Sequence, residues 1–252
     1  MYKILNTFIE LFIPKILSLK NLKYFLNLYY GRFYYGIIQG RRTNDRLNYD
    51  WSKINCNRIK LVNLFLHKSI NNNPESKYLE IGCANNKVFN SVIIKNKNKF
   101  GVDPEKGGNF RMTSDNFFIN NKEKFDVIFI DGLHTYEQCQ KDALNAIKNI
   151  NKNGVILFHD FIPTDWEKEN VPRFTEGWNG DVWKVAYELS NSKNCIFEVV
   201  ECDAGIGFLK ILDNFEYNLQ NEKLKDLSFK DFLKLKKEIP FIDPDSFIKK
   251  YL

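Results

Sequence analysis

The 252-residue sequence contains no long apolar run, no closely spaced cysteine pair and only three histidines. Because no 18 consecutive residues are apolar, we expect no transmembrane helix, and the lack of a small-residue cleavage site after an apolar core argues against a signal peptide. The five cysteines form no CxxC motif and are odd in number. Neither a disulfide framework nor a zinc knuckle is therefore expected, and we predict a cytoplasmic protein with buried, reduced cysteines.

The charge of the chain is unevenly distributed. Residues 1–75 contain twelve basic and four acidic side chains, whereas residues 76–252 contain 25 basic and 27 acidic ones. The formal net charge of +6 therefore arises entirely in the first third, which predicts a basic arm or cap. With 44% hydrophobic residues, the chain is too apolar to be disordered.

The N-terminal 38 residues read as two short amphipathic helices, broken near Pro14 and Gly31. Leu22, Leu26 and Tyr29 recur there at helical spacing. The first interpretation is a cap that packs on the body of the protein or forms a homodimer with a second copy. The alternative is attachment to a membrane surface without stable insertion.

From residue 76 onward, short strand-like runs alternate with helical ones. The expected strands are residues 77–81, 99–102, 125–131, 154–158, 195–200 and 206–211. This alternation predicts an α/β fold with a parallel sheet and helices on both faces, and a hairpin at Asp203-Ala204-Gly205 predicts one antiparallel edge strand. We expect a helical cap in 1–75, an α/β domain in 76–212 and a helical extension in 213–252.

A turn of small residues follows the first expected strand. The run Tyr78-Leu79-Glu80-Ile81-Gly82-Cys83-Ala84-Asn85-Asn86 ends a strand with an acid and opens a helix, and Gly82 permits a sharp turn and close approach of a ligand. Asp103 ends the second strand, where a carboxylate can accept hydrogen bonds from both hydroxyls of a ribose. The short side chains of Ser114 and Asp115 follow.

This combination resembles the class I S-adenosylmethionine-dependent methyltransferases, whose first motif is typically hhE/DhGxGxG. Gly82 matches the first glycine, and Ala84 and Asn86 stand at the other two. The resemblance implies a Rossmann-like, doubly wound, mostly parallel seven-stranded sheet with an antiparallel edge strand, and S-adenosyl-L-methionine as cofactor. The contacts it implies are Glu80 and Gly82 at the methionine part, Asp103 at the ribose and Asp115 at the adenine amine, with Ala84, Asn86, Ser114 and Asp131 nearby.

Each of these acids also has a plain structural interpretation. Glu80 can be a salt-bridged or helix-capping acid, Asp103 a turn residue before Pro104, and Asp115 the N-cap of a helix that begins near Asn116. A nicotinamide-dependent oxidoreductase is an alternative function, but it needs the complete glycine triad that this turn lacks.

Two further strands end in acid and histidine. Asp131 and His134 follow one buried strand, and His159-Asp160 follow the next. Because the carboxyl ends of parallel strands meet at one edge of a sheet, these four residues are expected to converge. The pattern D-G-x-H-x-Y-E, followed by H-D, is similar to a bacterial subfamily of these methyltransferases, often encoded near glycan or natural-product genes.

For methyl transfer to a hydroxyl, His134 is the first candidate for general base, because its ordinary pKa suits neutral pH. His159 is the rival base, and His134 can instead be a structural residue at the start of a helix. Asp131 and Asp160 can hold a divalent cation such as Mg²⁺, which takes one or two protein carboxylates together with water. The imidazole of His159 favours a softer metal or none.

The expected acceptor is a small molecule or a glycan-linked, anionic group such as a phosphorylated surface carbohydrate, as in capsule biosynthesis. Arg41, Arg42, Arg46 and Arg58 cluster before the first strand, and we expect Arg41 and Arg42 to contact such an acceptor. Trp178, in the loop that follows the His159-Asp160 strand, is a further candidate, with a packing role as its alternative. No nucleic-acid partner is expected, and a non-catalytic cofactor-binding subunit stays open as a function.

Overall fold

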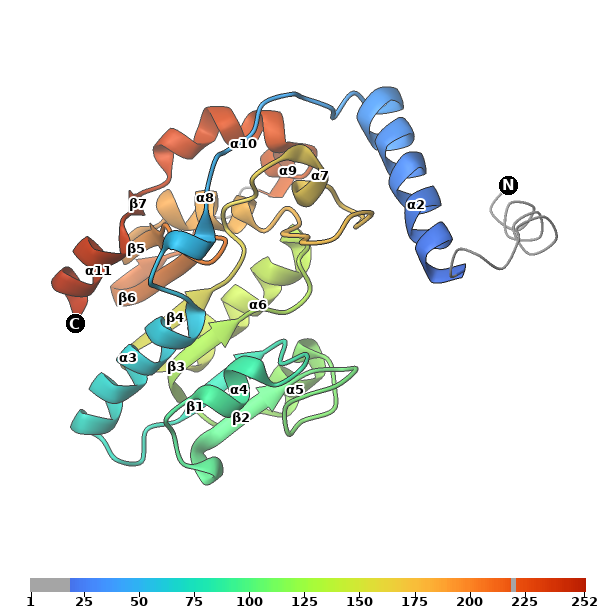
Figure 1. Ribbon diagram of the computed structural model, residues 1–252. Coiled ribbons are helices and arrows are strands. Elements are labelled where there is room, and N and C mark those ends of the chain that lie inside the picture. The colour runs from blue at the N-terminus through green and yellow to red at the C-terminus, as the bar shows by residue number, and fades with distance from the viewer. Residues whose placement is uncertain (1–18, 219–220) are drawn as a thin grey trace. The chain divides into compact units, whose positions relative to one another are not determined.

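The computed structural model describes residues 19–218 and 221–252, and the chain forms two units, Met1–Arg42 and Thr43–Leu252 (Figure 1). In the first unit, helix α2 (Leu19–Gly31) continues directly into a π-helix, η1 (Arg32–Ile38). Gly31 keeps right-handed helical angles, with φ −59° and ψ −46°, so the predicted break at Gly31 is wrong. Glycine permits a break in a helix but does not impose one.

The predicted helix before Pro14 lies outside the described residues. Across residues 19–218 and 221–252, every helix is too short or too polar to span a bilayer.

The second unit is built on a seven-stranded sheet in the order β2-β1-β3-β4-β6-β5-β7. Its strands are β1 (Tyr78–Ile81), β2 (Lys99–Val102), β3 (Phe125–Ile130), β4 (Ile150–Phe158), β5 (Lys193–Val200), β6 (Ile206–Glu216) and β7 (Phe241–Ile242). Strands β1 to β4 pair in parallel, and β6 runs antiparallel to both β4 and β5. The predicted mostly parallel, Rossmann-like α/β fold is confirmed, with β6 as its antiparallel strand. Strands β5 and β7 lie beyond β6, so the antiparallel strand is not itself the edge of the sheet.

Helices cover both faces of this sheet (Figure 1). On one face, α3 (Arg58–Asn72), α4 (Lys87–Ser91) and α11 (Pro244–Tyr251) pack on a core that includes Phe65, Phe129 and Phe208. On the other, α6 (Tyr136–Asn149) contacts β3, β4 and α8 (Trp183–Ser190). The remaining helices are η2 (Trp51–Lys53), η3 (Asn96–Asn98), α5 (Ser114–Asn120), α7 (Trp166–Glu169), α9 (Asn221–Leu224), α10 (Phe229–Leu235) and η4 (Lys236–Glu238).

The predicted boundaries at residues 75 and 212 differ from the observed division after Arg42. Helix α3, which the sequence assigns to the cap, buries Leu61 and Phe65 in the core of the sheet. At the other end, β7 pairs with β5, and α11 inserts Phe247 into the same core. Both segments are therefore parts of the α/β unit, because the sheet needs their apolar faces to cover it.

The strand order reverses between β1 and β3, since β2 lies on one side of β1 while β3 and β4 lie on the other. In open α/β sheets, ligands bind at such a point, outside the carboxyl ends of the strands. The β5–β6 hairpin reaches the same edge, because β6 begins beside the end of β4, with Gly207 opposite Phe158. Turns after β1 to β4 and the hairpin tip therefore meet at this edge.

Candidate active site

A cavity of about 880 Å³ opens at this edge of the sheet. Its wall contains the turns after β1, β2, β3 and β4, the first residue of α3 and the loop 161–179. Ligand pockets for small molecules typically measure about 300–1,000 Å³. The cavity is therefore large enough for a nucleoside-sized ligand together with a second small molecule.

The turn after β1 has the backbone conformation of a glycine-rich loop although only one glycine is present. Gly82 has φ +85°, and a Cβ atom there would lie 2.0 Å from the carbonyl oxygen of Asp131. Ala84 and Asn86, which occupy the other two glycine positions of the motif, also have positive φ angles of 44° and 63°. The departures from the motif thus keep its left-handed backbone, which asparagine tolerates better than alanine does.

Asp103 connects this turn with the end of β2. Its Oδ2 accepts a hydrogen bond from Ala84 N at 2.8 Å, and its Oδ1 accepts from the backbone of Glu105 and Lys106, each at 2.8 Å. Burial raises the pKa of Asp103, but these hydrogen bonds and Arg111 outweigh burial and lower it overall. The carboxylate is therefore ionised, and it lies in the cavity wall where it can accept further hydrogen bonds.

A polar group lines the cavity beside the start of α5. Gln138 Nε2 donates to Ser114 Oγ, Asp115 Oδ1 and Asp142 Oδ1 at 3.1–3.2 Å. Thr113, not Asp115, is the N-cap of α5, so the N-cap interpretation of Asp115 is wrong. The hydroxyl of Thr113 accepts from Asn116 N, which leaves the carboxylate of Asp115 to face Gln138.

Glu80 and Asn86 are placed differently from the other predicted cofactor residues, because neither is among the described residues that line the cavity. Glu80 is 1% exposed, and its Oε2 accepts from the Tyr78 hydroxyl at 2.8 Å. Burial raises the pKa of Glu80 to about 7. Asn86 Oδ1 accepts from Gly108 N at 2.6 Å and so connects the turn to the segment after β2.

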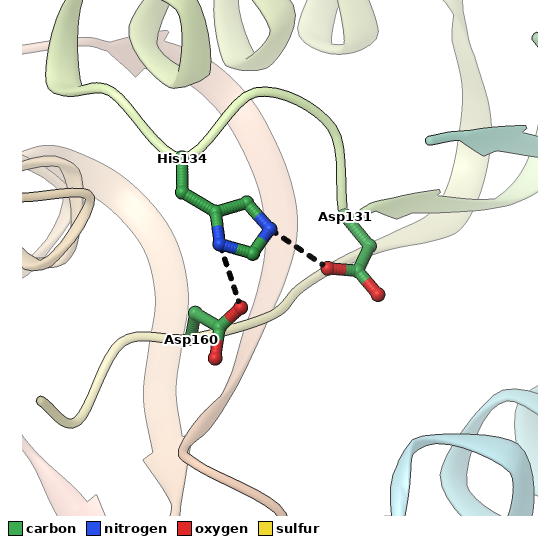
Figure 2. A group of neighbouring side chains, drawn as sticks. All are labelled: Asp131, His134 and Asp160. Carbon is green, nitrogen blue, oxygen red and sulfur yellow. Dashed lines mark ion pairs between the residues drawn. The ribbon is translucent and has the colours of Figure 1, made fainter. Parts of the chain in front are cut away.

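Asp131, His134, His159 and Asp160 converge as predicted, next to the turn. Figure 2 shows His134 between the two acids, with Nδ1 3.1 Å from Asp160 Oδ2 and Nε2 3.4 Å from Asp131 Oδ1. One donor atom from each of these three residues lies within 4.8 Å of the other two. The group therefore has the spacing of a metal site or of a general base flanked by acids.

The two histidines differ in exposure and in hydrogen bonding. The His134 side chain is 23% exposed and its Nδ1 is 2.9 Å from Trp178 O, whereas the His159 side chain is 4% exposed and its Nε2 is 2.8 Å from Asp203 O. Burial lowers the pKa of both histidines, but Asp131 and Asp160 outweigh it and raise both. His134 is thus open to a ligand, and His159 is enclosed.

Arg58 is the cation of this group. Its Nε and Nη2 donate to the two carboxylate oxygens of Asp203 at 2.8 and 2.9 Å, and its Nη1 donates to Asp131 Oδ2 at 2.8 Å. Such bidentate geometry fixes a guanidinium firmly. Burial raises the pKa of Asp131, but His159, His134 and Arg58 outweigh burial and hold it well below its usual range. Arg58 clusters with Arg41 and Arg42 in the sequence, but the structure places it in the cavity wall.

The loop 161–179 covers part of the cavity. Trp178 stacks on His134, with ring centroids 5.4 Å apart, and lines the cavity, whereas Trp166 is buried against Phe174 as a packing anchor. Asn179 is 4% exposed and donates to Asp160 Oδ1 at 2.7 Å. Trp178 is thus placed where a ligand could contact it, and its role in acceptor binding stays a prediction.

Arg41 and Arg42, the predicted acceptor contacts, belong to the first unit, whereas the described residues that line the cavity belong to the second. The cations of the loop that line the cavity are Lys168 and Arg173.

Sequence reasoning missed several residues of this site: Asp203, Gln138, Asp142, Asn179 and the role of Arg58. The spacing of Gln138 and Asp142 on α6 could have indicated a shared face, since residues four apart on a helix are neighbours. Nothing local in the sequence marks the pairing of Arg58 with Asp203, which are 145 positions apart.

Comparison with known proteins assigns a class to one segment of the chain. Residues 97–161 match a family model described as a methyltransferase domain. The segment covers about a quarter of the chain and includes Asp103, Ser114, Asp131, His134 and Asp160. No curated protein sequence matches the chain.

Several solved structures are similar to the chain at low sequence identity. A Corynebacterium glutamicum protein is 10% identical, with a TM-score of 0.47, over 84% of this chain and 98% of that one. The Podospora anserina methyltransferase PaMTH1, bound to SAH (S-adenosylhomocysteine), is 13% identical, with a TM-score of 0.44, over 80% and 100%. An O-methyltransferase from Bacillus cereus in complex with SAH is 12% identical, with a TM-score of 0.40, over 79% and 92%. These likenesses concern the fold alone.

Proposed function

We propose that this protein is an S-adenosylmethionine-dependent methyltransferase that methylates a hydroxyl group. The observation that carries the proposal is one cavity with two unlike sides. One side is the turn of Gly82 with the oriented carboxylate of Asp103, and the other is the pair of acids around His134. The methyltransferase-domain match spans residues from both sides, from Asp103 to Asp160.

In this proposal, the first side of the cavity binds the cofactor. Gly82 and Ala84 bring the backbone close to the methionine part, and Asp103 accepts hydrogen bonds from the ribose hydroxyls. Ser114 and Asp115 lie at the adenine, together with Gln138, which already donates to both. Neither Glu80 nor Asn86 lines the cavity: Asn86 supports the turn through its hydrogen bond from Gly108 N, and Glu80 accepts a hydrogen bond from Tyr78 on β1.

The second side performs the transfer. The acceptor oxygen attacks the methyl carbon, the carbon–sulfur bond breaks, and the hydroxyl proton passes to His134 Nε2. When Nδ1–H donates to Trp178 O, 2.9 Å away, Nε2 carries the lone pair that a general base needs. Asp131 Oδ1, 3.4 Å from Nε2, then stabilises the imidazolium that forms. Holding both reactants in this geometry provides much of the acceleration.

His159 is a positioning residue in this mechanism. Its Nδ1 lies 2.8 Å from Asp160 Oδ2 and 3.2 Å from Asp131 Oδ1, and its Nε2 faces Asp203 O. An acceptor therefore reaches His134 more readily than the enclosed His159.

The same residues fit a divalent cation. Asp131 Oδ1 and Asp160 Oδ2 would supply the oxygen ligands, a set that suits Mg²⁺ with water in its remaining positions. His159 Nδ1 is buried beside both oxygens without a hydrogen bond of good geometry, so the cluster has an unsatisfied polar atom among its described residues. A bound cation would lower the pKa of the acceptor hydroxyl.

The acceptor in this proposal is a small molecule or a glycan with an anionic group near the hydroxyl. Lys168 and Arg173 support the anionic character, because both line the cavity on the loop that carries Trp178. Any contribution of Arg41 and Arg42 stays a prediction, as do the carbohydrate and capsule context and the cytoplasmic location.

Calorimetry with SAH tests the cofactor assignment. We expect one SAH per chain, an affinity at least about tenfold weaker in Asp103→Asn because a charge-assisted hydrogen bond is lost, and an unchanged affinity in Trp178→Phe. A protein that binds NAD and not SAH would contradict the proposal and favour the oxidoreductase. SAH binding without methyl transfer from S-adenosylmethionine to any sugar phosphate or polyol offered would favour a non-catalytic subunit.

A further inference from the structure

The first unit exposes a dense group of large hydrophobic side chains. Seven of the twelve exposed large hydrophobic residues of the described chain lie within 14 positions: Phe25, Tyr29, Tyr30, Phe33, Tyr34, Ile37 and Ile38. Their exposed fractions run from 37% to 68%. Exposed hydrophobic residues on soluble proteins are normally scattered singly, and a contiguous group marks an interaction surface.

These residues lie on a short, amphipathic element. Leu22, Phe25, Leu26 and Tyr29 follow the i, i+3, i+4, i+7 spacing that places them on one face of α2, and exposed Lys23 lies between them in sequence and off that face. Helix α2 and η1 together form a helical segment of 20 residues, which Lys20, Lys23 and Arg32 interrupt with positive charge. No helix of the described residues is long and apolar enough to cross a bilayer. An apolar face with basic side chains beside it suits a helix that lies on a bilayer.

The charge of this region selects among the partners that an apolar face can have. Residues 11–44 contain six basic side chains and no acidic one. If a second copy of the same segment packed on this face, its basic side chains would lie near other basic side chains and near no carboxylate of that segment. An anionic lipid surface instead attracts each lysine or arginine by about 1 kcal/mol, and it accepts tyrosine and phenylalanine at the level of its headgroups.

We propose that residues 19–42 bind the surface of an anionic phospholipid bilayer, with the hydrophobic face of α2 and η1 in the interface and the basic side chains at the headgroups. The helix lies in the plane of the surface and does not cross it. This binding is independent of the methyltransferase assignment. It would hold the α/β unit close to the membrane surface.

Vesicle co-sedimentation of the full chain tests the proposal. We expect binding to phosphatidylcholine vesicles that contain about one-third phosphatidylglycerol, and at least about tenfold weaker binding to phosphatidylcholine alone. Raising the salt concentration from about 0.1 to about 0.5 M should release the protein from the anionic vesicles. Equal binding to both compositions, or none to the anionic one, would contradict the proposal.

Variants separate the two components of the surface. At about 0.1 M salt, Lys20→Glu with Lys23→Glu should weaken binding to anionic vesicles at least about tenfold, and so should Phe25→Ser with Phe33→Ser. The matched control is Lys122→Glu with Lys249→Glu, which changes the total charge equally at two exposed positions of the second unit and should leave binding unchanged.

Light scattering tests the alternative that a second copy of the chain covers this hydrophobic face. We expect Phe25→Ser with Phe33→Ser to leave the molar mass unchanged in solution. If the wild type is a dimer that this variant splits, and neither protein binds anionic vesicles, the face is a homodimer interface and the proposal is wrong. Equal melting temperatures of wild type and variants show that the second unit remains folded.

Discussion

The two sides of the cavity are built in different ways. The side near β1 and β2 is formed largely by backbone, and its main contact joins Ala84 N to Asp103, 19 positions apart. The side near β3 and β4 is formed by charged side chains, and Arg58 alone joins residues 73 and 145 positions away from it. A short-range backbone turn and a long-range network of charges thus face each other, so changes on the two sides should have separable effects.

Of the variants proposed, Gly82→Ala should have the largest effect on cofactor binding. In Gly82→Ala, the new Cβ would lie 2.0 Å from Asp131 O, which forces the turn and the strand end apart. We expect a loss of SAH binding by more than about 100-fold in calorimetry, since the contacts of the cofactor depend on this turn.

Gly40→Ala is the matched control for Gly82→Ala. Gly40 has a similar positive φ of 66°, but no atom lies within 4 Å of the added Cβ. This variant should keep the affinity for SAH. Equal loss in both variants would show that backbone strain, and not the packing of the turn on Asp131, determines binding.

Replacing the histidines should separate turnover from cofactor binding. We expect His134→Gln to lower kcat by about 10²–10⁴-fold, the usual contribution of a general base, while the affinity for SAH stays within about threefold. The measurement needs an acceptor that the wild type methylates.

His159→Gln should act mainly on stability and orientation, with a smaller loss of kcat and a lower melting temperature. The contrast between the histidines would disappear if His159→Gln lost more activity than His134→Gln. That result would transfer the role of base to His159.

Glu80→Gln should change the pH dependence of stability. Burial raises the pKa of Glu80 to about 7, from an ordinary value of 4.5. Between these values the native protein retains a proton that the unfolded chain has lost, so this group lowers the free energy of unfolding as the pH rises from about 4.5 to about 7. The difference in the free energy of unfolding between Glu80→Gln and the wild type should therefore depend on pH. From low pH to above about pH 7, it should shift in favour of Glu80→Gln by up to about 3 kcal/mol.

Thermal unfolding from about pH 5 to about pH 8 measures this effect. Glu137→Gln, at an exposed position on α6, is the control and should follow the wild type at every pH. Parallel curves for the wild type and Glu80→Gln would show that the carboxylate is already ionised in the native state at low pH.

The parts of this molecule that could be predicted from the sequence are those that depend on short-range patterns. The apolar run Phe125–Ile130 and the turn around Gly82 identified a central strand and the first side of the cavity. Convergence of His134 and Asp160 followed from the parallel sheet alone, because both residues come just after neighbouring strands.

The other residues required the packed structure. Arg58 follows Arg41 and Arg42 in the sequence, which suggests one basic cluster, but the hydrogen bond from the backbone N–H of Arg58 to Asp203 fixes α3 at the hairpin tip. Only the folded sheet brings that tip beside β4. The boundary after Arg42 was missed for a related reason, since the apolar face of α3 does not reveal which surface it covers.

A crystal structure with SAH tests the central claim most directly, because it locates the reacting sulfur relative to both sides of the cavity. We predict that the ribose hydroxyls bind Asp103, that the adenine lies beside Ser114 and Asp115, and that the sulfur points toward His134. SAH bound outside this cavity, or with its adenine against His134 and its sulfur away from that residue, would contradict the assignment of the two sides.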